Sequence, residues 1–153
     1  YIHFTVYPLS GMDGLERAIE VAVTAHAGDT DKSGAVYIRH PLRVMEQMDS
    51  DLDRIVAVLH DVVEDSSYEV EEIESEFGPD VGDAVDALTK RDSEDYLDEF
   101  IPRCAQNEVA RRVKQEDIKD NMDLTRLSDV TKQTGRRLVK YHQALQYLES
   151  SQN

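Results

Sequence analysis

The sequence has 153 residues, 40% of them hydrophobic and 7% aromatic, which is enough to bury a core, so we expect one domain over residues 1–153. Its formal net charge of −15 argues against a nucleic-acid surface, because nucleic acid would be repelled unless basic groups cluster locally. The single cysteine excludes an internal disulfide, and no stretch approaches the length of a membrane span, so we expect a cytoplasmic protein that contacts no membrane.

The first half of the chain predicts helices separated by turns. Residues 1–12 form a lead-in that begins extended and ends in a helix-capping pattern, and apolar residues then repeat at helical spacing to about residue 27. Residues 29–34 are polar and turn-rich, which is typical of a loop, and Pro41 is expected to open the next helix at its first position. The third helix is expected to start near Asp51 and to continue through the segment 58–65.

The second half shows the same helical periodicity. The spacing of apolar residues predicts two short helices over residues 70–77 and 79–88. The next helix should kink or end at Pro102, and a longer one is expected over residues 108–127. Residues 129–153 contain a final amphipathic helix that closes the domain. No strand-like alternation competes with these patterns, so the predicted fold class is an all-α helical bundle.

The segment 58–65 places a histidine and an aspartate next to each other inside an apolar run. Such a segment is expected to be buried, and a buried carboxylate normally protonates, pairs with a cation or coordinates a metal ion. Two polar residues elsewhere fit the same site, one just before a helix and one on a helical stripe shared with core valines. The candidate metal ligands are therefore His40, His60, Asp61 and Asp117.

These ligands are nitrogen and oxygen donors with no thiolate, which favours manganese, iron or zinc in an open site. A water molecule in the open position would become more acidic and could attack a phosphoryl group. Glu64 and Asp65 lie one helical turn after His60 and Asp61, so both acids can approach the same centre. Either acid could position or deprotonate the water, or protonate a leaving group.

Each of these residues also has an ordinary explanation when taken alone. His60 and Asp61 could form a hydrogen-bonded core pair, and His40 could simply mark a helix N-terminus. The two following acids could be a solvated helix end, and Asp117 with Asn121 an ordinary polar face. His26 lies at a helix end beside turn residues, so we expect it to cap that helix or to face solvent. The combination is much harder to obtain by chance than any one member.

Several motifs also occur in an order typical of one enzyme superfamily. They are the segments 31–41, 59–65, 77–78 and 88–90, followed by residues 113–117 with Asn121. In content and order they resemble the HD phosphohydrolase superfamily, and within it the hydrolase domain of the Rel/Spo stringent-response enzymes and the small stand-alone alarmone hydrolases. The resemblance covers about residues 15–127 and implies an HD-domain helical bundle with a metal site between helices.

The resemblance also implies roles for particular residues. One divalent metal ion, typically Mn²⁺ with Fe²⁺ or Zn²⁺ as alternatives, would be bound by His40, His60, Asp61 and Asp117. The acids that serve the hydrolytic water would be Glu64 and Asp65, and the nucleotide site would contain Lys32, Ser33, Tyr37 and Asn121. The implied substrate is a small phosphorylated nucleotide, and the implied reaction is removal of the 3′-pyrophosphate from guanosine tetra- or pentaphosphate by a metal-activated water.

Two positions depart from the alarmone hydrolases. Asp31 stands where those enzymes usually have an arginine that stacks on the guanine base, and Leu124 stands where they usually have a hydroxyl. An acid cannot supply the guanidinium plane and would repel phosphate if it faced the site. Three alternatives therefore stay open: hydrolysis of another phosphorylated nucleotide or dinucleotide, a regulatory HD module that binds nucleotide without turnover, and a purely structural bundle. The sequence does not indicate the oligomeric state.

Overall fold

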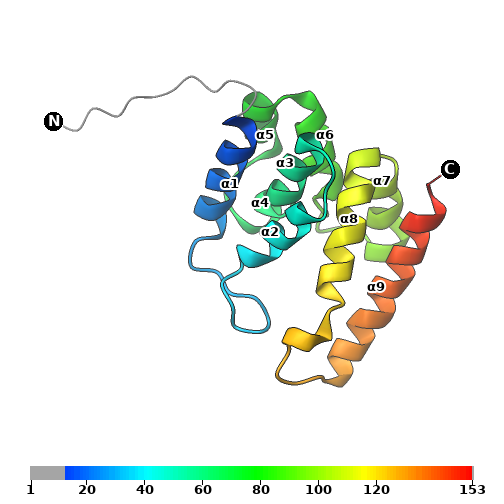
Figure 1. Ribbon diagram of the computed structural model, residues 1–153. Helices are drawn as coiled ribbons and strands as arrows, with labels where there is room; N and C mark the ends of the chain where they lie inside the picture. Colours follow the sequence, from blue (N-terminus) through cyan, green and yellow to red (C-terminus); the bar gives the residue numbers. More distant parts are fainter. Residues whose placement is uncertain (1–12, 153) are drawn as a thin grey trace.

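Helix α8, Glu108–Asn121, is the central element of the computed structural model, which describes residues 13–152. It contacts α2 Arg39–Glu46, α3 Asp51–Leu59, α6 Pro79–Leu88, α7 Ile101–Ala105 and α9 Lys132–Ser150. Figure 1 shows α8 running between the group formed by α1 to α6 and the pair α7 and α9. Any side chain that α8 projects toward α2 or α3 therefore lies between the two parts of the bundle.

The prediction of an all-α fold is confirmed. Within residues 13–152 there is no strand, and the only extended pairing is an isolated bridge between Thr30 and Val36. The remaining elements are α1 Asp13–His26, α2 Arg39–Glu46, α3 Asp51–Leu59, α4 Val62–Asp65, α5 Val70–Phe77, α6 Pro79–Leu88, the π-helical turn η1 Tyr96–Phe100, α7 Ile101–Ala105, the 3-10 turn η2 Leu124–Arg126 and α9 Lys132–Ser150. The lead-in over residues 1–12, with its capping pattern, lies outside the described residues.

The core is built from the apolar stripes that the sequence predicts. From α8 the residues Ala110, Val113 and Ile118 are each at most 1% exposed, and they meet buried side chains from α3, α6 and α7. Full burial of side chains the size of valine or isoleucine contributes about 1.5–3 kcal/mol each. Asp117 follows in the same stripe, so its carboxylate is carried into the interior by the packing of its neighbours.

The predicted third helix is interrupted at the histidine–aspartate pair, so the expectation of one continuous helix was wrong. Helix α3 ends at Leu59, and α4 begins at Val62. In a continuous helix the carbonyl oxygen of Ala57 would accept a hydrogen bond from the backbone N–H of Asp61. Here that oxygen accepts from His60 Nδ1 at 2.6 Å and from the His60 backbone N–H at 3.4 Å, so the imidazole competes with the helical ladder.

Four other helix boundaries differ from the expectation. Helix α2 begins at Arg39, so Pro41 is its third residue rather than its first. Pro102 does not end a helix, because it is the second residue of α7, which directly follows the π-helical η1. Helix α8 ends at Asn121 and is followed by η2, and α9 starts at Lys132.

Among residues 13–152, no helix is both long enough and apolar enough to cross a membrane.

Candidate metal centre

The imidazole of His40 reaches α8 with both of its nitrogens. His40 is the second residue of α2 and is 4% exposed. Its Nε2 lies 2.9 Å from Oδ1 of Asp117, and its Nδ1 lies 2.6 Å from Oδ2 of Asp120. Helices α2 and α8 are therefore joined through this one ring, and the side chain is held in a single orientation.

His60 presents one nitrogen to the same place. Its Nδ1 donates to the carbonyl oxygen of Ala57, so the lone pair of a neutral ring is on Nε2. This Nε2 is buried and has no hydrogen-bond partner, although it lies 3.0 Å from Oδ2 of Asp61 and 3.5 Å from Oδ1 of Asp117. A buried nitrogen that faces two carboxylates without a hydrogen bond is suited to bind a cation.

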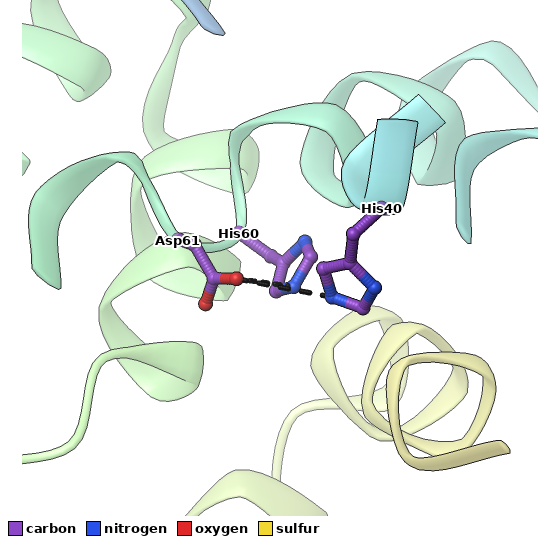
Figure 2. Close-up of side chains that lie close together, drawn as sticks. All are labelled: His40, His60 and Asp61. Atoms are coloured by element: carbon purple, nitrogen blue, oxygen red, sulfur yellow. Dashed lines mark ion pairs between the residues drawn. The ribbon is translucent and has the colours of Figure 1, made fainter. Parts of the chain in front are cut away.

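The two carboxylates complete the cluster. Figure 2 shows His40, His60 and Asp61 pointing toward one another, with one ligand atom from each lying within 4.8 Å of the others. Asp61 sits in the break between α3 and α4, where its carboxylate accepts a hydrogen bond from the hydroxyl of Tyr37. Asp117 lies against both histidines and also accepts from Asn121 Nδ2 at 2.9 Å.

Proton affinities in the cluster follow from these contacts. Burial alone would lower the pKa of His60, but the carboxylates of Asp61 and Asp117 raise it well above its ordinary value. Burial would also lower the pKa of His40, and its hydrogen bonds to the aspartates of α8 raise it instead. The pKa of Asp61 is lowered despite burial, because of His60. Protons on the two histidines therefore balance the negative charge of the carboxylates, and binding of a metal ion would release these protons.

Lys114 lies one turn before Asp117, and its role was not anticipated from the sequence. Its Nζ is 2.8 Å from Oδ2 of Asp117, and its side chain is only 13% exposed. Burial would lower the pKa of Lys114, but Asp117 raises it, so the ammonium stays charged. The i, i+3 spacing of a lysine and a candidate ligand was the available signal.

The two acids after the histidine–aspartate pair lie on α4. Glu64 Oε1 accepts a hydrogen bond from the backbone N–H of Lys90 at 2.6 Å, and burial raises the pKa of its carboxyl group. The pKa of Asp65 is raised to about 6 by burial and by the negative charges of Asp61 and Glu64. Both acids therefore lie close enough to Asp61 for its negative charge to raise their pKa values.

A cavity of about 400 Å³ opens beside the cluster. His40 lies in its wall, so the candidate metal centre and the cavity share a side chain. The four residues that the resemblance assigned to a nucleotide site all line it: Lys32, Ser33, Tyr37 and Asn121. The far wall comes from α9, which the sequence did not connect with the site, and it contributes Thr134, Arg137, Leu138 and Tyr141.

Positive charge gathers at one part of this cavity although the chain is strongly acidic. The pKa of Lys32 is lowered by burial and by the positive charges of Arg137 and Lys140. Lys140 Nζ also lies 4.7 Å from the centroid of the Tyr96 ring. Arg137 and Lys140 are three residues apart on one predicted helix, and this spacing was the only indication in the sequence that their positive charges lie on the same face.

Asp31, the departure from the alarmone hydrolases, is engaged within its own loop. Its Oδ1 accepts from the backbone N–H of Ser33 at 2.9 Å, from the Ser33 hydroxyl at 2.6 Å and from the backbone N–H of Ala35 at 3.0 Å. Asp31 therefore shapes the loop that presents Lys32 and Ser33 to the cavity.

The expectation that His26 caps a helix or faces solvent was wrong. The residue is 2% exposed, and neither of its ring nitrogens has a hydrogen-bond partner. Its ring packs against Tyr37 with 4.8 Å between the centroids, and burial lowers its pKa. The loop after α1 folds back over His26, which the position of the residue at a helix end could not indicate.

The family model for the HD domain matches residues 18–150. The chain belongs to the HD domain family. HD domains bind divalent metal ions, and the histidine–aspartate cluster is the place where this HD domain could hold one. The resemblance inferred from the order of the sequence motifs is thereby confirmed at the level of the family.

Relatives of this HD domain are stringent-response proteins. It is 41% identical over 95 residues to a probable GTP pyrophosphokinase of Mycobacterium leprae, which covers 60% of this chain and 12% of that protein. It is 34% identical over 125 residues to a guanosine-3′,5′-bis(diphosphate) 3′-pyrophosphohydrolase of Vibrio cholerae, covering 78% of this chain and 17% of the relative. The bifunctional (p)ppGpp synthase/hydrolase SpoT of Escherichia coli is 33% identical over 132 residues, which cover 83% of this chain and 18% of SpoT. The chain thus spans less than a fifth of the length of these relatives.

A solved structure supports the assignment of the fold. It belongs to a metazoan orthologue of SpoT that hydrolyses ppGpp, and it superimposes with a TM-score of 0.78 at 22% sequence identity. The match covers 96% of this chain and 90% of that one. The HD-domain bundle is therefore shared over nearly the whole length of both proteins.

Proposed function

We propose that this HD domain is a metal-dependent phosphohydrolase that removes the 3′-pyrophosphate from guanosine tetra- or pentaphosphate. The observation that carries the proposal is that a buried histidine–aspartate cluster shares His40 with a cavity whose lining includes Lys32 and Arg137, in a chain of net charge −15. A highly charged phosphate ester requires this combination of a metal site and local positive charge. The names of the relatives, which are ppGpp hydrolases and synthases, favour the same substrate.

The proposed cofactor is a single divalent ion, Mn²⁺ in the first instance, held by His40, His60, Asp61 and Asp117. The fit rests on the partnerless Nε2 of His60 and on the absence of thiolates from the donor set. When bound, such an ion lowers the pKa of a coordinated water and polarises a phosphoryl oxygen. Nitrogen and carboxylate donors from α2, α8 and the α3–α4 break would hold it.

The acids on α4 are the proposed proton carriers. Asp65, with its pKa of about 6, would accept the proton of the attacking water. Glu64, whose pKa is also raised, would return a proton to the ribose 3′ oxygen when its bond to phosphorus breaks. The products would be pyrophosphate and a 3′-hydroxyl group. Tyr37 keeps its proton, because burial and then Asp61 raise its pKa, so its hydroxyl would remain a donor to Asp61.

The cavity walls would bind the rest of the nucleotide. Lys32 and Arg137 both line the cavity and would neutralise phosphate oxygens. Asn121 uses one amide hydrogen on Asp117, which leaves its second hydrogen and its oxygen for a sugar or phosphate group. Ser33 donates both its hydroxyl hydrogen and its backbone N–H to Asp31, so toward substrate it would offer a lone pair of its hydroxyl oxygen.

The test is release of pyrophosphate from guanosine tetraphosphate by the purified chain with Mn²⁺. We expect release that a chelator abolishes, and loss of both metal binding and turnover in Asp61→Ala. Glu64→Gln should keep the metal and lose most of the rate. Asp86→Ala serves as a control, because Asp86 pairs with Arg91 away from the cluster and is 44% exposed. Equal loss of metal in Asp61→Ala and Glu64→Gln would contradict the separate roles.

A second function is favoured by Asp31. The carboxylate occupies a cavity-lining position where guanine-stacking arginine is usual, which points to another phosphorylated nucleotide as substrate of the same centre. An assay that detects both phosphate and pyrophosphate, run with a panel of nucleotides carrying 2′- or 3′-phosphates, separates the two. Metal-dependent turnover of another nucleotide with none of guanosine tetraphosphate would select the second function. Binding of nucleotide without turnover of any would instead select a regulatory module.

A further inference from the structure

Asp120 lies one turn after Asp117 on α8 and faces α2. Its side chain is 13% exposed, and its carboxylate contacts two residues of α2. Oδ2 lies 2.6 Å from Nδ1 of His40, and Oδ1 accepts from Nε of Arg43 at 2.8 Å. A partly buried carboxylate thus contacts the side of the His40 ring that faces away from the candidate metal centre.

We propose that Asp120 is a positioning residue that fixes the tautomer and orientation of His40 for metal binding. When Asp120 accepts the Nδ1 hydrogen, the free lone pair of the neutral imidazole is on Nε2, the nitrogen that faces Asp61 and Asp117. A carboxylate that accepts the second N–H of a ligating histidine also increases the basicity of the ligand. The inference rests on the proposed metal centre and adds to it a residue beyond the four candidate ligands.

Two arginines hold Asp120 in place for this role. Arg43 donates from both Nε and Nη2, at 2.8 and 3.1 Å, and it lies one turn after His40 on the same helix. Arg126, in η2, donates to the Asp120 backbone oxygen at 2.7 Å and lies 3.4 Å from Oδ2. Because the carboxylate is fixed from α2 and from η2, it cannot turn away from the histidine without losing charge-assisted hydrogen bonds.

An ion pair elsewhere in the bundle provides a matched comparison. Asp53 of α3 accepts from Nε and Nη2 of Arg112 on α8, at 2.6 and 3.0 Å, and is 5% exposed. Like Asp120, it is a carboxylate that joins α8 to a neighbouring helix through an arginine. Unlike Asp120, its carboxylate forms no hydrogen bond with a histidine among residues 13–152. Loss of Asp53 therefore reproduces the structural cost of losing such a pair without touching His40.

The test measures metal affinity rather than turnover. Mn²⁺ binding to the unmodified chain, Asp120→Ala, Asp120→Asn and Asp53→Asn is followed by isothermal titration calorimetry. We expect Asp120→Ala to weaken binding by about 10- to 100-fold, the range for loss of such an outer-shell partner, with Asp53→Asn unchanged. Asp120→Asn, which keeps an acceptor and the side-chain size, should lie between them. In the Zn²⁺-loaded chain, the proton on Nδ1 of His40 should give an NMR signal, because its hydrogen bond to Asp120 slows exchange with water. This signal should disappear in Asp120→Ala.

Two results would overturn the assignment. Folded Asp120→Ala and Asp120→Asn with the Mn²⁺ affinity of Asp53→Asn would reduce Asp120 to an interhelical ion pair. An Nδ1 proton signal of His40 that persists in Asp120→Ala would show that another group fixes the tautomer. Failure of the unmodified chain to bind Mn²⁺ is a distinct outcome, which would overturn the proposed metal centre itself.

Discussion

Replacement of Lys114 by methionine should destabilise the metal-free protein. The ammonium lies 2.8 Å from Oδ2 of Asp117, and the two side chains are 13% and 4% exposed. Removing one partner of a buried ion pair costs about 3–5 kcal/mol, because the other charge stays buried. Asp117 retains contacts with His40 and Asn121, so we expect the lower end of that range, about 3 kcal/mol. The ammonium also lies 5.2 Å from the centroid of the Phe100 ring, and methionine would lose this cation–π contact as well.

Urea unfolding in the presence of a chelator measures this change. Lys119→Met is the matched control: Lys119 pairs with Glu116 at 2.9 Å on the same helix but is 49% exposed, so its loss should cost less than about 0.5 kcal/mol. Added Mn²⁺ should recover much of the stability of Lys114→Met, because a divalent cation at the cluster also neutralises Asp117. A loss for Lys114→Met no larger than that for Lys119→Met would refute the reasoning.

Three further outcomes are expected. Gly82→Ala should lower the free energy of unfolding in urea by about 1–2 kcal/mol, because the new methyl group would lie 2.7 Å from Cβ of Glu74. Gly135 is the fourth residue of α9, as Gly82 is of α6, but has open space around it, so Gly135→Ala should raise the free energy of unfolding by about 0.5–1 kcal/mol. In the metal-free chain, the pKa of Asp65 is raised from 3.8 to about 6, so between pH 3.8 and pH 6 the folded state binds more protons than the unfolded state. The melting temperature should therefore fall as the pH rises through this range, and Asp65→Asn should remove this dependence on pH. Mn²⁺ should raise the melting temperature in a concentration-dependent manner, and an unchanged melting curve at saturating metal would contradict binding to the folded state alone.

Sequence patterns pointed to the residues of the cluster because a short apolar segment, which is expected to be buried, contains a histidine and an aspartate that cannot be buried without a partner. His60 and Asp61 stand inside an apolar run, and Asp117 shares the stripe of Val113, so their inward direction follows from helical periodicity. The structure brings these residues together with His40, while their roles as metal ligands remain predictions.

Other features depend on contacts between distant segments and had no local signal. The break between α3 and α4 arises because the His60 ring takes the carbonyl oxygen of Ala57, a competition that propensity does not reveal. The burial of His26 depends on packing against Tyr37. Arg137 becomes part of the cavity only because α9 returns alongside α8. Periodicity describes the faces of single helices, and these three features belong to pairs of segments.

The candidate ligands come from parts of the chain that are far apart, since His40 and Asp117 are separated by 77 residues. An ion held by both would act as a reversible crosslink that closes a long loop. A covalent link across a loop of this length would stabilise by about 4.5 kcal/mol through the entropy of the unfolded chain. With one cysteine, this sequence cannot form such a link within itself. Metal supply would then regulate the lifetime of the folded chain as well as its chemistry, and starvation for the ion would leave the helices of the bundle easier to separate and to digest.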